Sequence, residues 1–514
     1  MSAITVYDTT LRDGAQRAGI SFSVGDKLHI ARRLDDLGLA YIEGGWPGSN
    51  PKDQRFFTEL KRHPLRRARA VAFSSTRKAT TTVEIDPNLR ALLEAGTPDV
   101  AVFGKSWDYH VTTALGTDLA ENLRMIGESV AYLRRLDRRV IYDAEHFFDG
   151  LRANPEYAWA TLRAAADAGA EWLVLCDTNG GSLPWTVAEV VKEAGRRFPG
   201  RRLGIHAHDD GGVAVANTLA AVEAGALMVQ GTINGYGERC GNANLCTVMA
   251  DLELKMGRIC LPPGGLAELT AVSHYVSELA NLPFSDAQPY VGRNAFSHKA
   301  GVHVSALSKD PRLYEHVDPG AVGNQRHILV SELAGRSNLL QRLDGGLSAA
   351  RAASILELVK VRELEGYQYE GAEASLHLLG RDGPAPFRLL GLRVLVSSDG
   401  EGGTNSEASI KLRIGERLVH TAAEGNGPVN ALDSALRKAL MEVHPQVARV
   451  RLTDYKVRVL EGSDGTGAKV RVLIESTDGE RVWGTVGVSA NILEASWQAL
   501  ADSLAYYLTR AEAS

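Results

Sequence analysis

The chain has 514 residues, and at roughly 150 residues per domain this length predicts about three domains. Its 57 Lys and Arg residues against 62 Asp and Glu residues give a formal net charge of −5, which disfavours a nucleic-acid-binding chain. The 44% hydrophobic and 23% charged content excludes an acidic disordered chain. No stretch reaches the ~18 uninterrupted apolar residues of a membrane helix, and residues 1–10 lack the pattern of a signal peptide. We therefore expect a cytoplasmic enzyme without nucleic-acid or membrane partners.

The first 261 residues alternate short apolar runs with amphipathic helical patterns. One such helix carries Leu119, Leu123, Ile126, Val130 and Leu133 on a single face. The expected strands are Ile4–Tyr7, Tyr41–Glu43, Arg69–Phe73, Val100–Phe103, Arg139–Tyr142, Trp172–Leu175, Leu203–His206 and Met228–Ile233. Eight strand–helix units in this length predict a (β/α)8 TIM barrel. A doubly wound open sheet is the alternative, but polar residues follow many different strands, as they do at the mouth of a barrel.

Two further regions follow the expected barrel. Residues 262–385 are predicted to be a mostly helical linker region. Residues 386–514 have a β-β-β-α order that occurs twice, which predicts a duplicated α+β domain with an offset of 61 residues between the repeats. A duplicated unit without catalytic-type residues is more typical of small-molecule binding than of chemistry, with a purely structural role as the alternative.

Two histidines and two oxygen-bearing side chains indicate a metal site. His206 and His208 are two residues apart at the end of a strand, so their imidazoles point to the same side. Asp13 and Asn242 follow the first and eighth strands, which neighbour the seventh when the barrel closes. Two nitrogen and two oxygen ligands fit Zn²⁺ or an ion similar to Mn²⁺, with positions left open for substrate. Ordinary hydrogen-bonded surface histidines are the alternative.

Three segments carry a resemblance to a known family. They are DTTLRDGAQ at residues 8–16, IHAHDDGG at 205–212 and NGYGERCGN at 234–242. Together they resemble the signature segments of the 2-isopropylmalate synthase/homocitrate synthase/citramalate synthase family, over essentially the whole chain. The segments FGKSWDYH at 103–110 and YDAEHFFDG at 142–150 are most similar to the citramalate synthase branch.

The resemblance implies a Claisen-type condensation of acetyl-CoA, as co-substrate, with a 2-oxo acid, followed by thioester hydrolysis. It assigns Asp13, His206, His208 and Asn242 to a divalent metal, which could be Zn²⁺, Mn²⁺ or Mg²⁺. The metal would chelate the 2-oxo acid and act as a Lewis acid.

The resemblance also assigns roles to four further barrel residues. Arg12 matches the arginine that stabilises charge on the keto oxygen, with a structural ion pair as the alternative. Glu145 matches the active-site glutamate, whereas the residues alone leave Asp143 and Glu145 equal candidates for the base. Gln16 and Thr178 match substrate-binding positions, although a hydroxyl at 178 could instead cap a helix.

Outside the barrel, the resemblance points to residues that act between subunits. His303 and Tyr314 match residues that the family's linker region contributes to the active site of the partner subunit. His298 is the alternative to His303. A homodimer is therefore expected.

The duplicated domain implies feedback control. The corresponding domain of the family binds the end-product amino acid of the pathway, which for citramalate is isoleucine. The turn at 425–429 and its expected counterpart at 486–490 precede equivalent helices, so Gly427 and Ala490 are candidate effector-binding residues.

The leading interpretation is an acyltransferase that makes (R)-citramalate from pyruvate and acetyl-CoA in isoleucine biosynthesis. Phe73 and Phe103, at the rims of the third and fourth strands, are expected to restrict the acceptor pocket. A 2-isopropylmalate synthase, which uses 2-oxoisovalerate, is the nearest alternative. A metal-dependent lyase or aldolase with the same barrel would lack the duplicated domain, and an amino-acid sensor with a dead barrel would lack a ligand or a base.

Overall fold

The computed structural model describes residues 3–298, 301–307, 309–328, 349–381, 383–398, 403–460 and 467–511. The chain forms two compact units, one of residues 1–296 with 316–326, and one of residues 297–315 with 327–514. The domain boundaries that the sequence predicts at 261/262 and 385/386 stay predictions. Among the described residues, no helix is long and apolar enough to cross a membrane.

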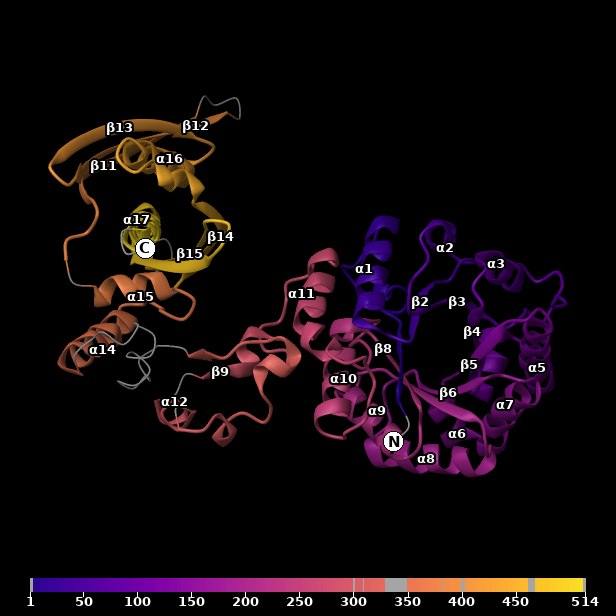
Figure 1. The fold of residues 1–514 in the computed structure, drawn as a ribbon. Helices are drawn as coiled ribbons and strands as arrows, with labels where there is room; N and C mark the ends of the chain where they lie inside the picture. The colour runs from indigo at the N-terminus through magenta and orange to yellow at the C-terminus, as the bar shows by residue number, and fades with distance from the viewer. Residues whose placement is uncertain are drawn as a thin grey trace. The chain divides into compact units, whose positions relative to one another are not determined.

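The first unit contains a closed barrel of eight parallel strands, which confirms the predicted TIM barrel and excludes an open sheet (Figure 1). Strand β1 pairs with both β2 and β8, so the sheet has no free edge. The strands are β1 (Thr5–Asp8), β2 (Tyr41–Gly45), β3 (Arg69–Ser75), β4 (Asp99–Lys105), β5 (Arg139–Glu145), β6 (Trp172–Asp177), β7 (Arg202–Ala207) and β8 (Met228–Gly231).

Helices surround the barrel and begin and end where local chemistry favours it. Ser23 and Asp26 form a reciprocal capping box at the start of α1, and Gly38 ends that helix in the left-handed conformation. The helices are α1 (Val24–Leu37), α2 (Pro51–Arg62), α3 (Pro87–Ala95), α4 (Asp108–His110), α5 (Leu119–Arg135), α6 (Phe147–Ala153), α7 (Pro155–Asp167), α8 (Pro184–Arg197), α9 (Ala214–Glu223), α10 (Leu245–Leu254) and α11 (Leu269–Leu279).

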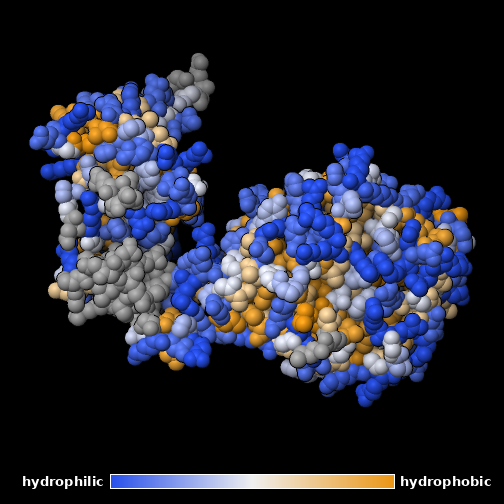
Figure 2. Space-filling model, viewed as in Figure 1, coloured by the Kyte–Doolittle hydropathy of each residue, from blue (hydrophilic) through white to orange (hydrophobic). Residues whose placement is uncertain are grey.

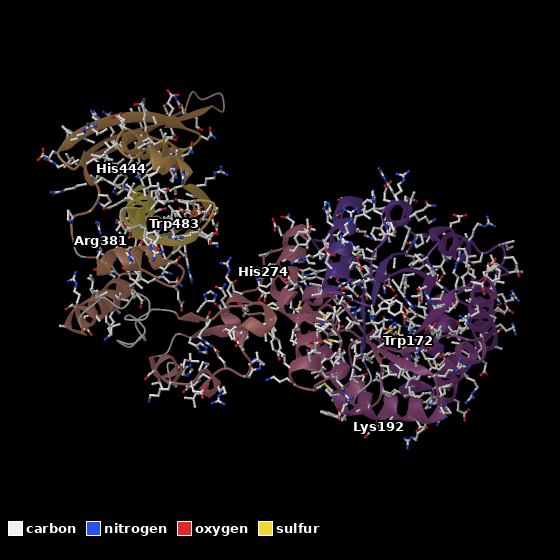
Figure 3. All side chains as sticks on the ribbon, in the orientation of Figure 1. Trp172, Lys192, His274, Arg381, His444 and Trp483 are labelled. Carbon is white, nitrogen blue, oxygen red and sulfur yellow. The ribbon has the colours of Figure 1, made fainter. Side chains whose placement is uncertain are left out.

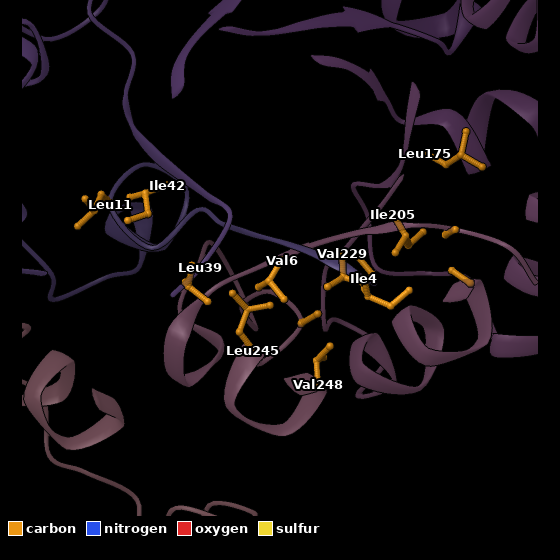
Figure 4. Close-up of a cluster of buried hydrophobic side chains, with 14 of the residues drawn as sticks. Ile4, Val6, Leu11, Leu39, Ile42, Leu175, Ile205, Val229, Leu245 and Val248 are labelled. Carbon is orange, nitrogen blue, oxygen red and sulfur yellow. The ribbon is translucent and has the colours of Figure 1, made fainter. Parts of the chain in front are cut away.

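Two apolar layers hold the barrel together. The outer layer lies between strands and helices, where Val6 and Val229 meet Leu245 and Val248 of α10 (Figure 4). The inner layer fills the barrel itself and includes Trp172, whereas Lys192 of α8 projects outward (Figure 3). The barrel is therefore a packed core with its chemistry confined to one end.

One predicted strand is too long. The sequence predicts Met228–Ile233, but β8 ends at Gly231 and Ile233 begins a short 3-10 turn. Asn234 has a positive φ of 63°, a conformation that a strand cannot contain. The turn redirects the chain across the mouth of the barrel.

The second unit contains short helices and the duplicated domain. Its elements up to residue 381 are β9 (Ser297–His298), α12 (Gly301–Leu307), β10 (His327–Ile328), α14 (Ala349–Leu364) and α15 (Glu373–Gly380). The duplicated domain comprises β11 (Arg388–Ser398), β12 (Thr404–Ile414), β13 (Arg417–Gly425), α16 (Pro428–Met441), β14 (Arg451–Val459), β15 (Val470–Thr477), β16 (Val482–Ser489) and α17 (Ile492–Ala511). Each repeat is a three-stranded antiparallel sheet followed by a helix, as predicted.

The offset between the repeats is 64 residues, so the predicted offset of 61 is wrong. Thr421 pairs with Ile410 and donates to Ala435 O, and Thr485 makes the same two contacts 64 residues later, with Ile474 and Ala499 O. An offset of 61 would match Asn430 with Asn491, but the two side chains occupy different positions relative to their helices. Asn430 lies inside α16, whereas Asn491 precedes α17 and accepts from Leu493 N. With an offset of 64, the structural counterpart of Gly427 is Asn491.

Candidate active site

The predicted metal ligands meet at the C-terminal end of the barrel. Asp13 follows β1, and Asn242 lies in the loop after β8. His206 lies near the end of β7, and His208 directly follows that strand. The two Nε2 atoms of His206 and His208 are 3.2 Å apart, and Asp13 Oδ2 lies 3.2 Å from the first and 3.8 Å from the second. Asn242 Nδ2 donates to Asp13 Oδ2 at 2.8 Å. Asp13, His206 and His208 thus form one buried cluster with convergent ligand atoms.

The chemistry of this cluster fits a divalent cation. Burial first, and then the neighbouring His206, lower the pKa of His208 to about 3, so its imidazole is neutral. Burial opposes ionisation of Asp13, but the charge of Arg12 and the contact with His206 outweigh burial and hold the pKa of that carboxyl well below its usual range. A carboxylate and a neutral imidazole that face one another are ready electron-pair donors. The buried atoms His208 Nδ1 and Asn242 Oδ1 have no hydrogen-bond partner among the described residues.

A glycine allows Asn242 to take this place. A Cβ on Gly237 would lie 1.9 Å from Asn242 Oδ1, and Gly237 has a φ of 156°. Any side chain at position 237 would therefore displace Asn242.

His206 is supported from inside the barrel. Its Nδ1 lies 2.9 Å from Oε1 of the fully buried Gln230, and Gln230 Nε2 donates to Asp143 Oδ1 at 3.1 Å. Burial, followed by the charge of Glu43, raises the pKa of Asp143 to about 7. Asp143, the alternative base that the sequence left open, is thus hydrogen-bonded to Gln230, which contacts His206 of this cluster.

Arg12 is held at the edge of the same cluster. Its Nε donates to Glu43 Oε1 at 2.5 Å, and Tyr7 OH donates to the other oxygen of Glu43 at 2.5 Å. The guanidinium carbon lies 3.9 Å from the centre of the Phe73 ring. Arg12 therefore has the structural ion pair considered above and also lines the cavity, so its orientation is fixed before substrate binds.

Glu145 ends β5 and forms an ion pair with Lys105, which ends β4. The two residues are register partners in the barrel, so the pairing follows directly from the sheet. Both side chains remain partly exposed, at 24% for Glu145 and 18% for Lys105. Glu145 thus lines the cavity and is paired with the ammonium group of Lys105, a residue that the sequence did not single out.

Thr178 does not cap a helix. Helix α8 begins at Pro184 with Leu183 before it, and the Thr178 hydroxyl instead accepts from His146 N at 2.8 Å. His146 has a positive φ of 57°, which turns the chain sharply after Glu145. Because the Thr178 oxygen accepts this bond, its own proton remains available to a ligand.

These groups surround one cavity of about 210 Å³. Seven of the predicted site residues line it: Arg12, Asp13, Gln16, Glu145, Thr178, His206 and His208. One wall is aromatic, with the rings of Phe73 and Phe103 stacked at 5.3 Å and Trp46 edge-on to both. The cavity is thus lined by charged side chains on one part of its surface and by aromatic side chains on another, as expected for a small polar substrate with an apolar end.

Apart from Asn242, which belongs to the first unit, the predicted site residues outside the cavity lining lie in the second unit. The rings of His303 and Tyr314 stack with their centres 4.0 Å apart, and Tyr314 is 44% exposed. His298, the alternative to His303, is buried and its Nε2 lies 3.2 Å from Glu315 Oε1. Gly427 precedes α16, and the exposed Ala490 lies between β16 and α17.

Sequence reasoning missed four residues of the site. Gln230, Glu43 and Lys105 contact His206, Arg12 and Glu145, and Trp46 completes the aromatic wall. Gln230, Glu43 and Lys105 lie on β8, β2 and β4, far in sequence from the residues that they contact, so strand register was needed to identify them. For Gln230 and Glu43 the available signal was a polar residue inside a strand that otherwise reads as apolar, and Trp46, which follows β2, had no such signal.

Three family models match the chain in succession. An HMGL-like model matches residues 3–276, a homocitrate synthase post-HMGL domain-like model matches 290–361, and a LeuA allosteric (dimerisation) domain model matches 373–508. The chain thus belongs to the HMGL-like family, with an allosteric domain of the LeuA type.

Similarity to characterised families of full-length proteins identifies the branch of the family to which the chain belongs. The chain is 54% identical to an (R)-citramalate synthase of Synechocystis, with 99% of this chain and 96% of that protein covered. It is 51% identical to the (R)-citramalate synthase of Aquifex aeolicus, with 99% and 98% covered. A 2-isopropylmalate synthase of Listeria monocytogenes is only 30% identical, with 97% and 96% covered. The chain belongs to the (R)-citramalate synthase family, which confirms the branch that the sequence resembles.

Proposed function

We propose that this chain condenses acetyl-CoA with pyruvate to give (R)-citramalate and CoA. The observation that carries the proposal is the full-length similarity, above 50% identity, to (R)-citramalate synthases, together with a cavity that combines the metal cluster with an aromatic wall. The allosteric domain distinguishes the chain from a lyase that consists of the barrel alone.

In this proposal Asp13, His206, His208 and Asn242 hold a divalent cation, which could be Zn²⁺, Mn²⁺ or Mg²⁺. A bound cation of this kind polarises the keto group of the 2-oxo acid and fixes its orientation. Two imidazole nitrogens and a carboxylate that converge in a buried cluster support the assignment. For Asn242, rotation of the amide by half a turn would bring the unpartnered Oδ1 to the cluster.

The chain's own residues supply the rest of the chemistry. The Glu145 carboxylate takes a proton from the acetyl methyl group, and that carbon forms a bond to C2 of pyruvate. The guanidinium of Arg12, already fixed by Glu43, stabilises the negative charge that grows on the keto oxygen before this oxygen is protonated. The Thr178 hydroxyl donates to the substrate carboxylate, and Gln16 lines the same cavity. Water then cleaves the thioester and releases CoA.

The second unit has two proposed roles. The LeuA allosteric (dimerisation) model supports a homodimer with an amino-acid effector, which we propose to be isoleucine, held near Gly427 and Ala490. Exposed Leu390, Leu395 and Leu418 place apolar surface over the β11–β13 sheet, where Figure 2 shows apolar side chains. Such a surface is suited to a subunit interface. His303 and Tyr314 would serve the active site of the partner subunit.

The product tests the proposal. Purified protein with a divalent metal, acetyl-CoA and pyruvate should form (R)-citramalate, resolved by chiral chromatography, with one CoA released for each pyruvate consumed. Release of CoA without citramalate, or cleavage of citramalate without synthesis, would overturn it.

A further inference from the structure

We propose that Gln230 is a positioning residue for His206, and that Asp143 acts on His206 through Gln230. In this arrangement Gln230 keeps the proton of His206 on Nδ1, so that Nε2 faces the metal cluster as an electron-pair donor. The inference rests on the proposed metal site.

The contacts form a continuous line across three strands. Gln230 on β8 is the register partner of His206 on β7, and its side chain is fully buried. Its Oε1 lies 2.9 Å from His206 Nδ1, and its Nε2 donates to Asp143 Oδ1 on β5 at 3.1 Å. The end of the line is His206 Nε2, which lies 3.2 Å from Asp13 Oδ2.

The donor and the acceptor can be assigned in each hydrogen bond of this series. The amide N–H of Gln230 donates to Asp143 Oδ1. The amide oxygen is then the group that faces His206, and an oxygen can only accept from the ring. In the neutral ring of His206 the proton is then on Nδ1, which leaves the lone pair of Nε2 toward Asp13 and His208. An amide without a fixed neighbour could present either end.

The free-energy cost of burying Gln230 and Asp143 indicates that these polar side chains do more than fill space in the barrel. An amide and a carboxylate inside a barrel lose their hydration, and an apolar side chain would fill the same space without that cost. The partner of a metal-binding histidine fixes its tautomer and orientation, and its loss typically weakens metal binding by roughly 10–100-fold.

The test measures metal affinity of the full chain rather than turnover. Metal-free protein is titrated with Co²⁺ and followed by its visible absorption, with circular dichroism as the check on folding. Gln230→Met keeps the length of the side chain but removes the amide, and should weaken Co²⁺ binding by about 10–100-fold. Asp143→Asn keeps an oxygen acceptor for Gln230 and should stay close to wild type. Asp143→Leu frees the amide and should fall between the two.

The double variant shows whether Asp143 acts through Gln230. If it does, Asp143→Leu should add no further loss in the Gln230→Met background, because the line is already broken. Equal affinity of folded Gln230→Met and wild type would overturn the inference, as would full additivity in the double variant. Should Gln230→Met not fold, Asp143→Leu with wild-type affinity overturns it instead. Wild-type protein that binds no Co²⁺ at the cluster would contradict the proposed metal site itself, and the inference with it.

Discussion

The mouth of the barrel and the C-terminal repeats bury polar side chains of different kinds. At the barrel mouth the buried polar groups include ionisable ones, such as Glu43, Asp143 and His206, which contact groups from other strands. Among the residues described from 388 onward, the buried polar side chains are hydroxyls: Ser406, Thr421, Ser476, Thr485, Ser496 and Ser503. The threonines donate to the carbonyl of their own repeat's helix. Buried charges that face one another indicate chemistry, whereas satisfied hydroxyls indicate a scaffold suited to binding and control.

The largest expected effect is the loss of a metal ligand. His208→Ala should lose the metal and turnover together, because the cluster keeps only one imidazole, while the barrel stays folded. Metal content by mass spectrometry and citramalate formation measure the two losses. His29→Ala, on the exposed surface of α1, is the control. An active, metal-replete His208→Ala protein would remove the metal assignment.

Loss of the base should come next. Glu145→Gln removes the proton acceptor but keeps the shape, so turnover should fall by roughly 10²–10⁴. Metal and pyruvate binding, measured by calorimetry, should remain. Turnover within a few-fold of wild type would return the role of base to Asp143 or another group.

Control by isoleucine should be separable from catalysis. A coupling free energy of about 1–3 kcal/mol between the isoleucine site and the active site corresponds to a change of roughly 5–150-fold in affinity. Gly427→Phe should relieve the inhibition by isoleucine and leave turnover without isoleucine unchanged. A Cβ on Gly427 meets open space and the backbone is extended, so the fold accepts the change. Gly467→Phe, where a Cβ also meets open space, is the matched control. If isoleucine fails to bind wild-type protein in calorimetry, the effector assignment is wrong.

The smallest effect tests the equivalence of the two repeats. Thr421→Val and Thr485→Val each remove one buried hydrogen bond to a helix carbonyl, at 3.0 and 2.8 Å. Each should lower the free energy of unfolding by about 0.5–1.5 kcal/mol without a change in uninhibited kcat/KM. Chemical denaturation measures the change. A substantial loss of activity in either variant would show that the repeats take part in catalysis.

Sequence alone predicted the barrel, the duplication and the convergence of Asp13, His206 and His208, because each depends on periodicity or on a local motif. Asp13 and His206 follow strands whose order is dictated by a closed parallel sheet. The residues that support the site could not be predicted, since Gln230 and Glu43 lie on neighbouring strands and their partners depend on side-chain geometry. The offset of 61 failed because identical asparagines serve different roles at Asn430 and Asn491.

The acceptor substrate tests the proposed function most directly. We would measure kcat/KM for CoA release with pyruvate, 2-oxobutyrate and 2-oxoisovalerate at a fixed acetyl-CoA concentration. Trp46, Phe73 and Phe103 line the same cavity as Asp13, His206 and His208, and each methylene that does not fit such a pocket is worth about 1–3 kcal/mol. Pyruvate should therefore exceed 2-oxoisovalerate by at least about 10-fold. A preference for 2-oxoisovalerate would contradict the proposal and make the protein a 2-isopropylmalate synthase.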